Sequence, residues 1–135
     1  RRRFVVLDAA MNDLLRPALY EAWHGILPVA AHHAGRPLTP ADVVGPVCET
    51  ADTFARDRAL PALAEDDLVA ILDTGAYGAV MSSTYNARPW AAQVMVEGGR
   101  FAVIRPRATA ADLWAAETLP DFSSPSLSSW AHRAP

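Results

Sequence analysis

The segment around Gly98-Gly99 constrains the fold more than any other part of the sequence. Two alternating apolar runs, residues 93–97 and 100–104, flank this glycine pair. A two-residue glycine turn joins antiparallel strands readily, because glycine adopts the positive φ values that tight hairpin turns need. The pattern predicts a β-hairpin over residues 93–104 and, with it, an antiparallel sheet.

Other short apolar runs predict further strands, and few segments predict helices. Candidate strands cover residues 4–8, 23–29, 42–44 and 68–72, and the first and last of these read as buried runs. About six or seven strands against two or three short helices predict a mostly β fold. We expect a small barrel or sandwich of antiparallel strands.

The segments between these strands carry weaker signals. Asn12 or Asp13 is a candidate N-cap for a helix over Leu14 and Leu19, which Pro17 should limit to about one turn. Residues 54–61 read as a polar connection, and residues 73–78 as a turn. Thr109 is expected to cap a short helix that reaches residue 115.

Length and charge exclude several classes of protein. The 135 residues correspond to one domain, for which we expect a folded part over residues 1–118 and a loose Ser/Pro-rich tail over 119–135. A net charge of −3 gives no electrostatic footprint for nucleic acid. No run of about 18 apolar residues predicts a membrane span. The single cysteine favours a reducing compartment, so we expect a cytoplasmic protein.

All 12 basic residues are arginine, and the sequence has no lysine. Codon bias in a GC-rich genome explains such a composition. Its chemical consequence is independent of the cause, because the chain cannot form a lysine Schiff base.

The only cysteine, Cys48, lies in the stretch Gly-Pro-Val-Cys-Glu-Thr-Ala-Asp at residues 45–52. A thiol beside a carboxylate in a loop is compatible with catalysis, but a lone cysteine is also a common small core residue. Adjacent His32 and His33 form a poor chelate, and no Cys or acidic residue stands at metal-ligand spacing from them. We therefore expect both histidines to be solvated loop residues, and no metal site.

Two further features can bind ligands. Arg16 and Tyr20 are four residues apart, so they share a face if the segment is helical, and together they could hold a carboxylate. Tyr77 stands between Gly75 and Gly78, where backbone can approach a ligand closely. A surface arginine and packed tyrosines remain the alternative for each.

Four stretches in this order resemble one family: DAAMNDLLRPALY at 8–20, GPVCETAD at 45–52, GAYGAVMSSTYNARP at 75–89, and residues 109–114. They are similar to the C-terminal part of the diaminopimelate decarboxylases, and the resemblance covers about residues 4–115. The resemblance implies a two-domain enzyme dependent on pyridoxal 5'-phosphate (PLP). Its TIM-like barrel, absent from this chain, would carry the Schiff-base lysine and most of the cofactor site. The chain then reads as the C-terminal β-domain, truncated and inactive by itself.

The same resemblance implies roles for five residues. Cys48 corresponds to the proton donor and Glu49 to a substrate contact. Arg16 and Tyr20 correspond to substrate-binding residues, and Tyr77 to a contact with both cofactor and substrate. The family offers its Cys-Glu stretch across a homodimer interface, which implies shared active sites.

The resemblance implies conversion of meso-2,6-diaminopimelate to L-lysine and CO2, in lysine biosynthesis. A positioned acid must return a proton to the carbon that loses CO2, and a thiol can do so. Arg16 favours this substrate over ornithine, because the distal end of ornithine is an amine alone. Two alternatives stay open: a related decarboxylase of the carboxynorspermidine or ornithine type, and a non-catalytic β-domain that mediates assembly.

Overall fold

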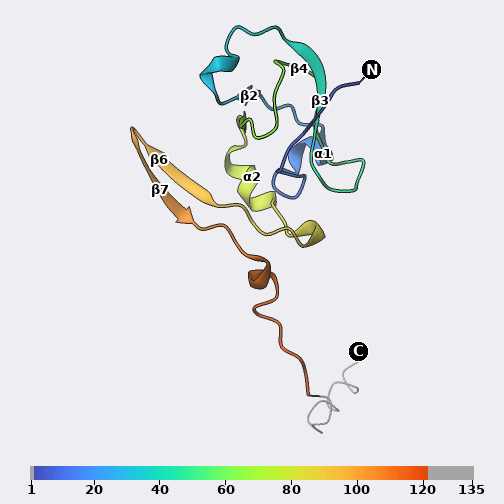
Figure 1. Ribbon diagram of the computed structural model, residues 1–135. Coiled ribbons are helices and arrows are strands. Elements are labelled where there is room, and N and C mark those ends of the chain that lie inside the picture. The colour runs from blue at the N-terminus through green and yellow to red at the C-terminus, as the bar shows by residue number, and fades with distance from the viewer. Residues whose placement is uncertain (1, 122–135) are drawn as a thin grey trace.

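Seven strands and two α-helices make up most of the regular structure of residues 2–121, which are the residues that the computed structural model describes (Figure 1). Three short 3₁₀ segments, labelled η, complete it. In chain order the elements are β1 (Phe4–Val6), α1 (Arg16–Tyr20), β2 (Ile26–Pro28), η1 (Ala31–His33), β3 (Thr39–Val44), β4 (Thr53–Leu60), β5 (Val69–Ile71), α2 (Gly75–Met81), η2 (Tyr85–Ala87), β6 (Gln93–Glu97), β7 (Arg100–Arg105) and η3 (Ala110–Leu113).

The largest sheet has the strand order β1-β3-β4. β3 and β4 are antiparallel, but β1 runs parallel to β3, with Val5 opposite Val43. The parallel pair is an exception to the expected antiparallel architecture. It arises because about thirty residues, including α1 and β2, separate the two strands and let the chain return in the same direction.

The segment expected as a polar connection, residues 54–61, forms most of β4 instead. Phe54 and Leu60 are buried there, while Arg56 and Asp57 face solvent. The backbone N–H of Asp57 donates to the buried carboxylate of Asp42 on β3, which supports the ladder where its register shifts. Pairing with β3 thus outweighs the polar composition of the segment.

The core of the described part lies between this sheet, the two-stranded β2-β5 sheet and the segment that precedes α1. Six buried side chains form it: Leu14, Ile26, Val43, Phe54, Ala55 and Leu60. Val69 and Ile71 of β5 are only partly buried beside it, and Leu68 is exposed. β5 is therefore less buried than its apolar sequence predicts.

Three local predictions are wrong. β1 is not buried on both faces, because Phe4 is 56% and Val6 64% exposed. α1 is about one turn long as expected, but its N-cap is Leu15 and not Asn12 or Asp13. Pro17 therefore lies in the first turn, where a missing N–H costs nothing, and does not end the helix. The expected turn that contains Tyr77 is part of α2.

The histidine pair also differs from expectation. His32 is exposed, but His33 is only 4% exposed, and its Nε2 lies 3.2 Å from Oδ2 of Asp67. The acidic neighbour is not visible in the sequence, because more than thirty residues separate it from His33. His33 is therefore not a solvated loop residue.

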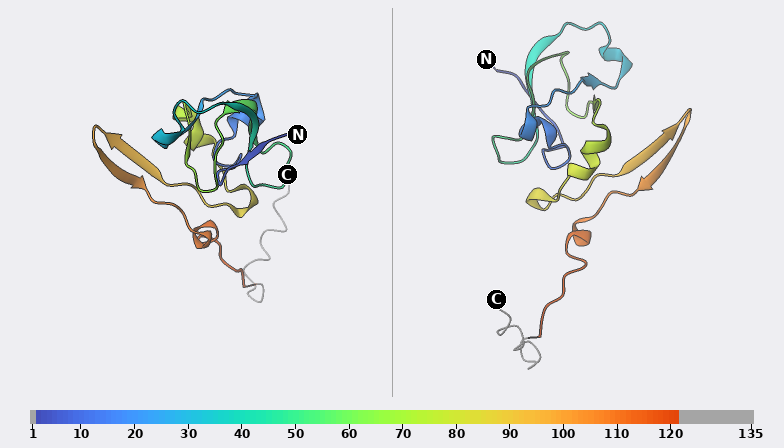
Figure 2. Two further views of the ribbon diagram at one scale, coloured as in Figure 1. Left: turned by 45° about the horizontal axis from the view of Figure 1, so that its top comes forward. Right: turned by 180° about the vertical axis from the view of Figure 1, so that it is seen from behind.

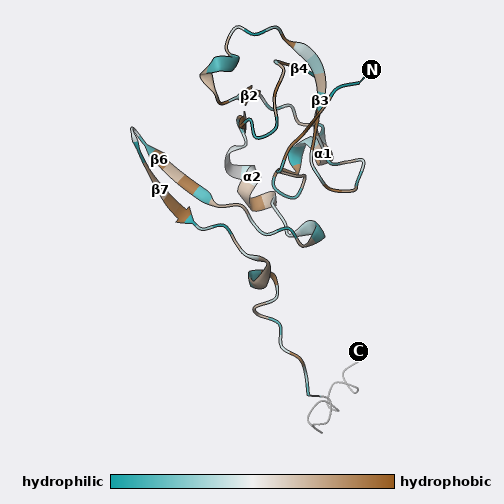
Figure 3. Ribbon diagram, viewed as in Figure 1, coloured by the Kyte–Doolittle hydropathy of each residue, from teal (hydrophilic) through white to brown (hydrophobic). Residues whose placement is uncertain are grey.

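The hairpin predicted from Gly98-Gly99 is confirmed as β6 and β7, with Gly98 at a φ of 58°. It projects from the rest of the described chain in two views (Figure 1, Figure 2). Apolar residues mark both strands (Figure 3), and Val96 and Phe101 are 69% and 76% exposed. The hairpin therefore presents apolar surface that it does not itself cover.

The predicted mostly β class with few helices is confirmed, but the strands of residues 2–121 form three separate sheets and no closed barrel. Thr109 caps η3 as expected, through a capping box with Asp112, but η3 ends at Leu113 and does not reach residue 115. The predicted loose tail falls largely on residues 122–135, outside the described residues, so its boundary stays a prediction. Within the described part, no helix has the length and apolarity that crossing a membrane requires.

Replacing Leu60 with alanine tests the position of the core. Leu60 is 1% exposed at the end of β4, so Leu60→Ala should lower the free energy of unfolding of the full chain by about 2–5 kcal/mol. Leu68→Ala is the matched control, because Leu68 is 71% exposed and its loss should change stability by less than about 0.5 kcal/mol. Urea denaturation followed by circular dichroism measures both, and equal effects would contradict this core.

Candidate functional site

The loop that carries Cys48 connects β3 to β4 over residues 45–52. Asp52 closes it: its Oδ2 accepts from the N–H of Val47 at 2.8 Å, and its buried side chain is 3% exposed. A Cβ added to Gly45 would overlap the Asp52 carboxylate, so only glycine fits there. Asp52 is therefore a structural clamp, and the thiol of Cys48 is left exposed on the closed loop.

Glu49, next to Cys48, contacts a residue that the sequence patterns did not single out. The hydroxyl of Tyr85 on η2 donates to Oε2 of Glu49 at 2.7 Å. This hydrogen bond, followed by the negative charge of Glu49 and by partial desolvation of the phenol, raises the pKa of Tyr85 above its ordinary value. The phenol thus stays a proton donor to Glu49 over a wider pH range, and it fixes one carboxylate oxygen.

Three of the predicted site residues meet around one guanidinium. Arg16 at the start of α1 lies 5.8 Å from the ring centroid of Tyr20, as their four-residue spacing predicts. The same guanidinium lies 5.2 Å from the ring centroid of Tyr77 on α2. Both tyrosines are 61% exposed, so the arginine is held by ring contacts while its surroundings stay open to a ligand.

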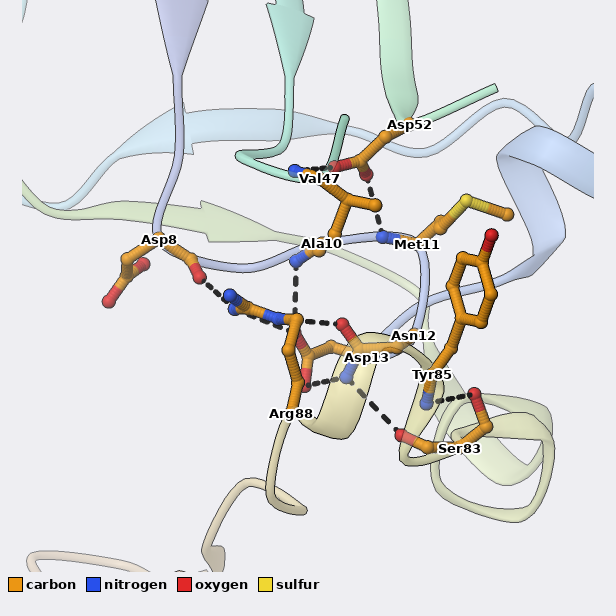
Figure 4. A network of polar contacts seen from close by, with 10 residues as sticks. All are labelled: Asp8, Ala10, Met11, Asn12, Asp13, Val47, Asp52, Ser83, Tyr85 and Arg88. Carbon is orange, nitrogen blue, oxygen red and sulfur yellow. Dashed lines mark hydrogen bonds and ion pairs between the residues drawn. The ribbon is translucent and has the colours of Figure 1, made fainter. Parts of the chain in front are cut away.

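A polar network around Asn12 holds the α2–η2 region against the segment that leads into α1 (Figure 4). Nε of Arg88 donates to Oδ1 of Asn12 at 2.9 Å, and its NH2 group reaches the carbonyl of Asp8 and, at 3.8 Å, the carboxylate of Asp13. The Asn12 side chain, 2% exposed, donates onward to the carbonyl of Ser83 at 3.3 Å. The network therefore holds the chain just after α2, where the N–H of Tyr85 donates to the hydroxyl of Ser83 at 3.3 Å.

The same segment is tied to the cysteine loop. The N–H of Met11 donates to Oδ1 of Asp52 at 2.7 Å, so one carboxylate joins the loop to the network of Figure 4. Within residues 2–121, however, no hydrogen bond or ring contact links Cys48 or Glu49 directly to Arg16. The structure therefore places the five predicted residues in two groups with a common support.

Sequence reasoning missed the supporting residues because each one acts at long range. Local spacing makes Asn12 a candidate N-cap, yet its side chain bonds to residues more than seventy positions away. Tyr85 and Arg88 stand inside the stretch that carries the family resemblance, which is the one signal that could have drawn attention to them. Asp52 stands out in the sequence only as an acid near the thiol.

The donor set fits a contact with PLP but not its covalent attachment. The phenol of Tyr77 is exposed beside a guanidinium, an arrangement that suits an anionic ligand. The chain has no lysine, so the amine that holds the cofactor is not among its residues. A thiol, a carboxylate, a guanidinium and phenols could supply proton transfer and recognition of a zwitterionic amino acid.

Comparisons with known proteins point in the same direction. Residues 1–75 match the family described as pyridoxal-dependent decarboxylase, C-terminal sheet domain. A diaminopimelate decarboxylase from Zymomonas mobilis is 55% identical over 111 residues, which are 82% of this chain and 26% of that protein. One from Vibrio cholerae is 49% identical over 118 residues, which are 87% of this chain and 28% of that protein.

A solved structure extends the likeness to three dimensions. The crystal structure of diaminopimelate decarboxylase from Helicobacter pylori complexed with L-lysine superposes with a TM-score of 0.78 at 46% identity. The match covers 85% of this chain and 28% of that one. The chain thus spans just over a quarter of the length of the relatives it matches.

Removing the Asp52 carboxylate tests the clamp. Asp52→Ala should leave the N–H groups of Met11 and Val47 without their acceptor. Each N–H group that stays buried should lower the free energy of unfolding by about 1–3 kcal/mol. Hydrogen exchange at both amides should become faster. Thr50→Ala, an exposed change in the same loop, is the matched control and should leave both amides protected. Unchanged protection in Asp52→Ala would show that the loop is held by other contacts.

Proposed function

The chain belongs to the pyridoxal-dependent decarboxylases as their C-terminal sheet domain, and we propose that it serves a diaminopimelate decarboxylase. The enzyme would convert meso-2,6-diaminopimelate to L-lysine and CO2. The single observation that carries this substrate is the Arg16 guanidinium, held beside the rings of Tyr20 and Tyr77. The 55% identity to the Zymomonas mobilis enzyme supports the same assignment.

Diaminopimelate has an amino acid centre at each end. The end that does not lose CO2, its distal end, carries a carboxylate and an ammonium group, which suit Arg16 and Glu49 of this chain. Its carboxylate suits Arg16, since guanidinium groups bind carboxylates through paired charge-assisted hydrogen bonds. Its ammonium group suits Glu49, of which Tyr85 fixes one oxygen and leaves the other available. An ornithine-type substrate has no distal carboxylate and would leave Arg16 without a partner.

Cys48 is the group that we assign to proton transfer. The carbon that loses CO2 must regain a proton, and a thiol can act as the positioned acid that donates it. The exposed position of Cys48 on a loop closed by Asp52 presents its Sγ outward without disturbing the core. When bound, PLP would supply the electron sink for the bond cleavage, with Tyr77 as the contact that this chain offers to it.

The remainder of the site would come from other protein surface. We propose a homodimer with shared sites and a barrel domain that supplies the lysine and most of the cofactor contacts. The exposed apolar residues of the β6–β7 hairpin, such as Phe101, support burial against another surface. The free thiol of Cys48 is consistent with a cytoplasmic location.

A chimera tests the function directly. This chain should replace the matching C-terminal quarter of the Zymomonas mobilis enzyme, and lysine and CO2 formation should be measured with meso-diaminopimelate, carboxynorspermidine and ornithine. Activity on the first substrate alone supports the proposal. A chimera that binds PLP, seen by its visible absorbance, yet turns over none of the three would contradict a catalytic role and favour an assembly domain.

Cys48→Ala tests the proton donor in that chimera. Loss of a positioned acid should lower kcat by about 10²–10⁴-fold, while the absorbance of bound PLP stays unchanged. Thr50→Ala, two residues along the same exposed loop, should keep kcat within about twofold. Normal turnover in Cys48→Ala would remove the thiol from the mechanism.

Arg16→Met, made in the same chimera, tests whether Arg16 binds the distal carboxylate of diaminopimelate. Loss of a charge-assisted hydrogen bond of about 1.5–3 kcal/mol should weaken binding of diaminopimelate roughly 10- to 150-fold, seen as a higher KM. Arg107→Met, which removes an exposed arginine, is the matched control and should leave KM unchanged. If both variants have the same KM, Arg16 does not hold the substrate and a different distal group must be sought.

A further inference from the structure

Three potential metal ligands gather beyond the ends of β2 and β5. His32 and His33 lie on η1, and Asp67 lies in the loop just before β5. One side-chain ligand atom from each residue lies within 4.8 Å of the other two. Within the part of the fold that contains β1 to β5, η1 and the Cys48 loop lie on different sides, as Figure 1 and the reverse view of Figure 2 both show.

We propose that His32, His33 and Asp67 bind a divalent transition-metal ion, with Zn²⁺ as the expected occupant. Two imidazoles and one carboxylate form a ligand set that suits zinc and its neighbours cobalt and nickel better than magnesium or calcium. Three protein ligands leave the fourth tetrahedral position for water. None of the three belongs to the residues assigned to decarboxylation, so the metal site is independent of the proposed function.

The separation of the two inner ligands fits such an ion. Nε2 of His33 and Oδ2 of Asp67 are 3.2 Å apart. Two ligand atoms on a tetrahedral zinc ion, each bonded at about 2.0–2.1 Å, are roughly 3.3 Å apart. The His32 ring lies beside that of His33, with the two ring centroids 4.0 Å apart. Because His32 is exposed, its ring can rotate toward an ion held by His33 and Asp67.

The burial of His33 also favours a bound ion. Its side chain is 1% exposed, and the partner of its Nε2 is the Asp67 carboxylate at 3.2 Å. A buried imidazole that faces a carboxylate oxygen is held in one position, so both donor atoms point toward the same place before an ion arrives. A metal ion bonded to both atoms would replace this contact and would neutralise the carboxylate.

The carboxylate of Asp67 is also held in a position from which it can bind the ion. The N–H of Ala64 donates to Oδ2 of Asp67 at 2.7 Å. The same oxygen lies 3.2 Å from Nε2 of His33, so the backbone hydrogen bond holds the carboxylate facing the imidazole.

The backbone holds both loops in place. Antiparallel pairing puts Pro28 opposite Val69, and the N–H of Val29 donates to the carbonyl of Leu68 at 2.8 Å. Asp67 therefore lies just beyond the end of this ladder, and His33 follows Val29 within one short turn. The ion would join two loops that are more than thirty residues apart in sequence, in the manner of a structural clamp.

Isothermal titration of the full chain with ZnCl₂ at pH 7 tests the site. Every sample should carry Cys48→Ser, so that the exposed thiol does not compete for the metal. We expect one ion per chain, and visible absorption bands typical of tetrahedral geometry when Co²⁺ is used instead. His32→Ala and Asp67→Asn should each weaken Zn²⁺ binding by at least about 100-fold, since even residues that only support a metal ligand change affinity by 10- to 100-fold.

Asp66→Asn is the matched control, because it removes the neighbouring carboxylate at a positive φ that asparagine tolerates. It should bind Zn²⁺ as the parent does. His33→Ala is avoided as the main test, because loss of a buried side chain can unfold the chain; circular dichroism should confirm that His32→Ala and Asp67→Asn stay folded. Absence of stoichiometric binding in the parent, or folded variants that bind equally to it, would overturn the proposal.

Discussion

The carboxylate of Asp52 is the interaction on which the candidate site depends most. It accepts hydrogen bonds from Val47, within its own loop, and from Met11, in the segment that leads into α1. One buried side chain thus closes the loop that exposes Cys48 and ties that loop to a distant part of the chain. A carboxylate is suited to this task, because its two oxygens can serve two N–H groups that point from different directions.

From Met11 the support continues into a second set of contacts. Asn12 and Arg88 join the segment before α1 to the chain after α2, which is the chain that carries Tyr85. Arg16 is then held by aromatic rings on two helices, and Glu49 by a phenol. Polar side chains that are buried or half-buried therefore position the exposed groups that can meet a ligand.

Some parts of this arrangement were predictable from local sequence. Gly98-Gly99 predicted the hairpin, because turn geometry depends on two residues and their immediate neighbours. Thr109 was expected to cap a short helix for the same reason, and it does so through a capping box. β4 was missed because its polar residues form a strand through pairing with β3. α2 was missed because Gly75 and Gly78 are typical of turns, although both belong to the helix.

The candidate site shows the same division. Arg16 and Tyr20 were paired from their spacing, and Cys48 stood out as the only cysteine, while the roles of Cys48 and Glu49 came from the resemblance. The long-range contacts could not be predicted from spacing. Tyr85 lies thirty-six residues from its partner Glu49, and, outside this site, Asp67 lies thirty-four residues from its partner His33. The sequence by itself determined the local turns, the caps and the chemical groups available. Only the tertiary structure decided which groups meet, because long-range contacts depend on how strands pair and not on distance along the chain.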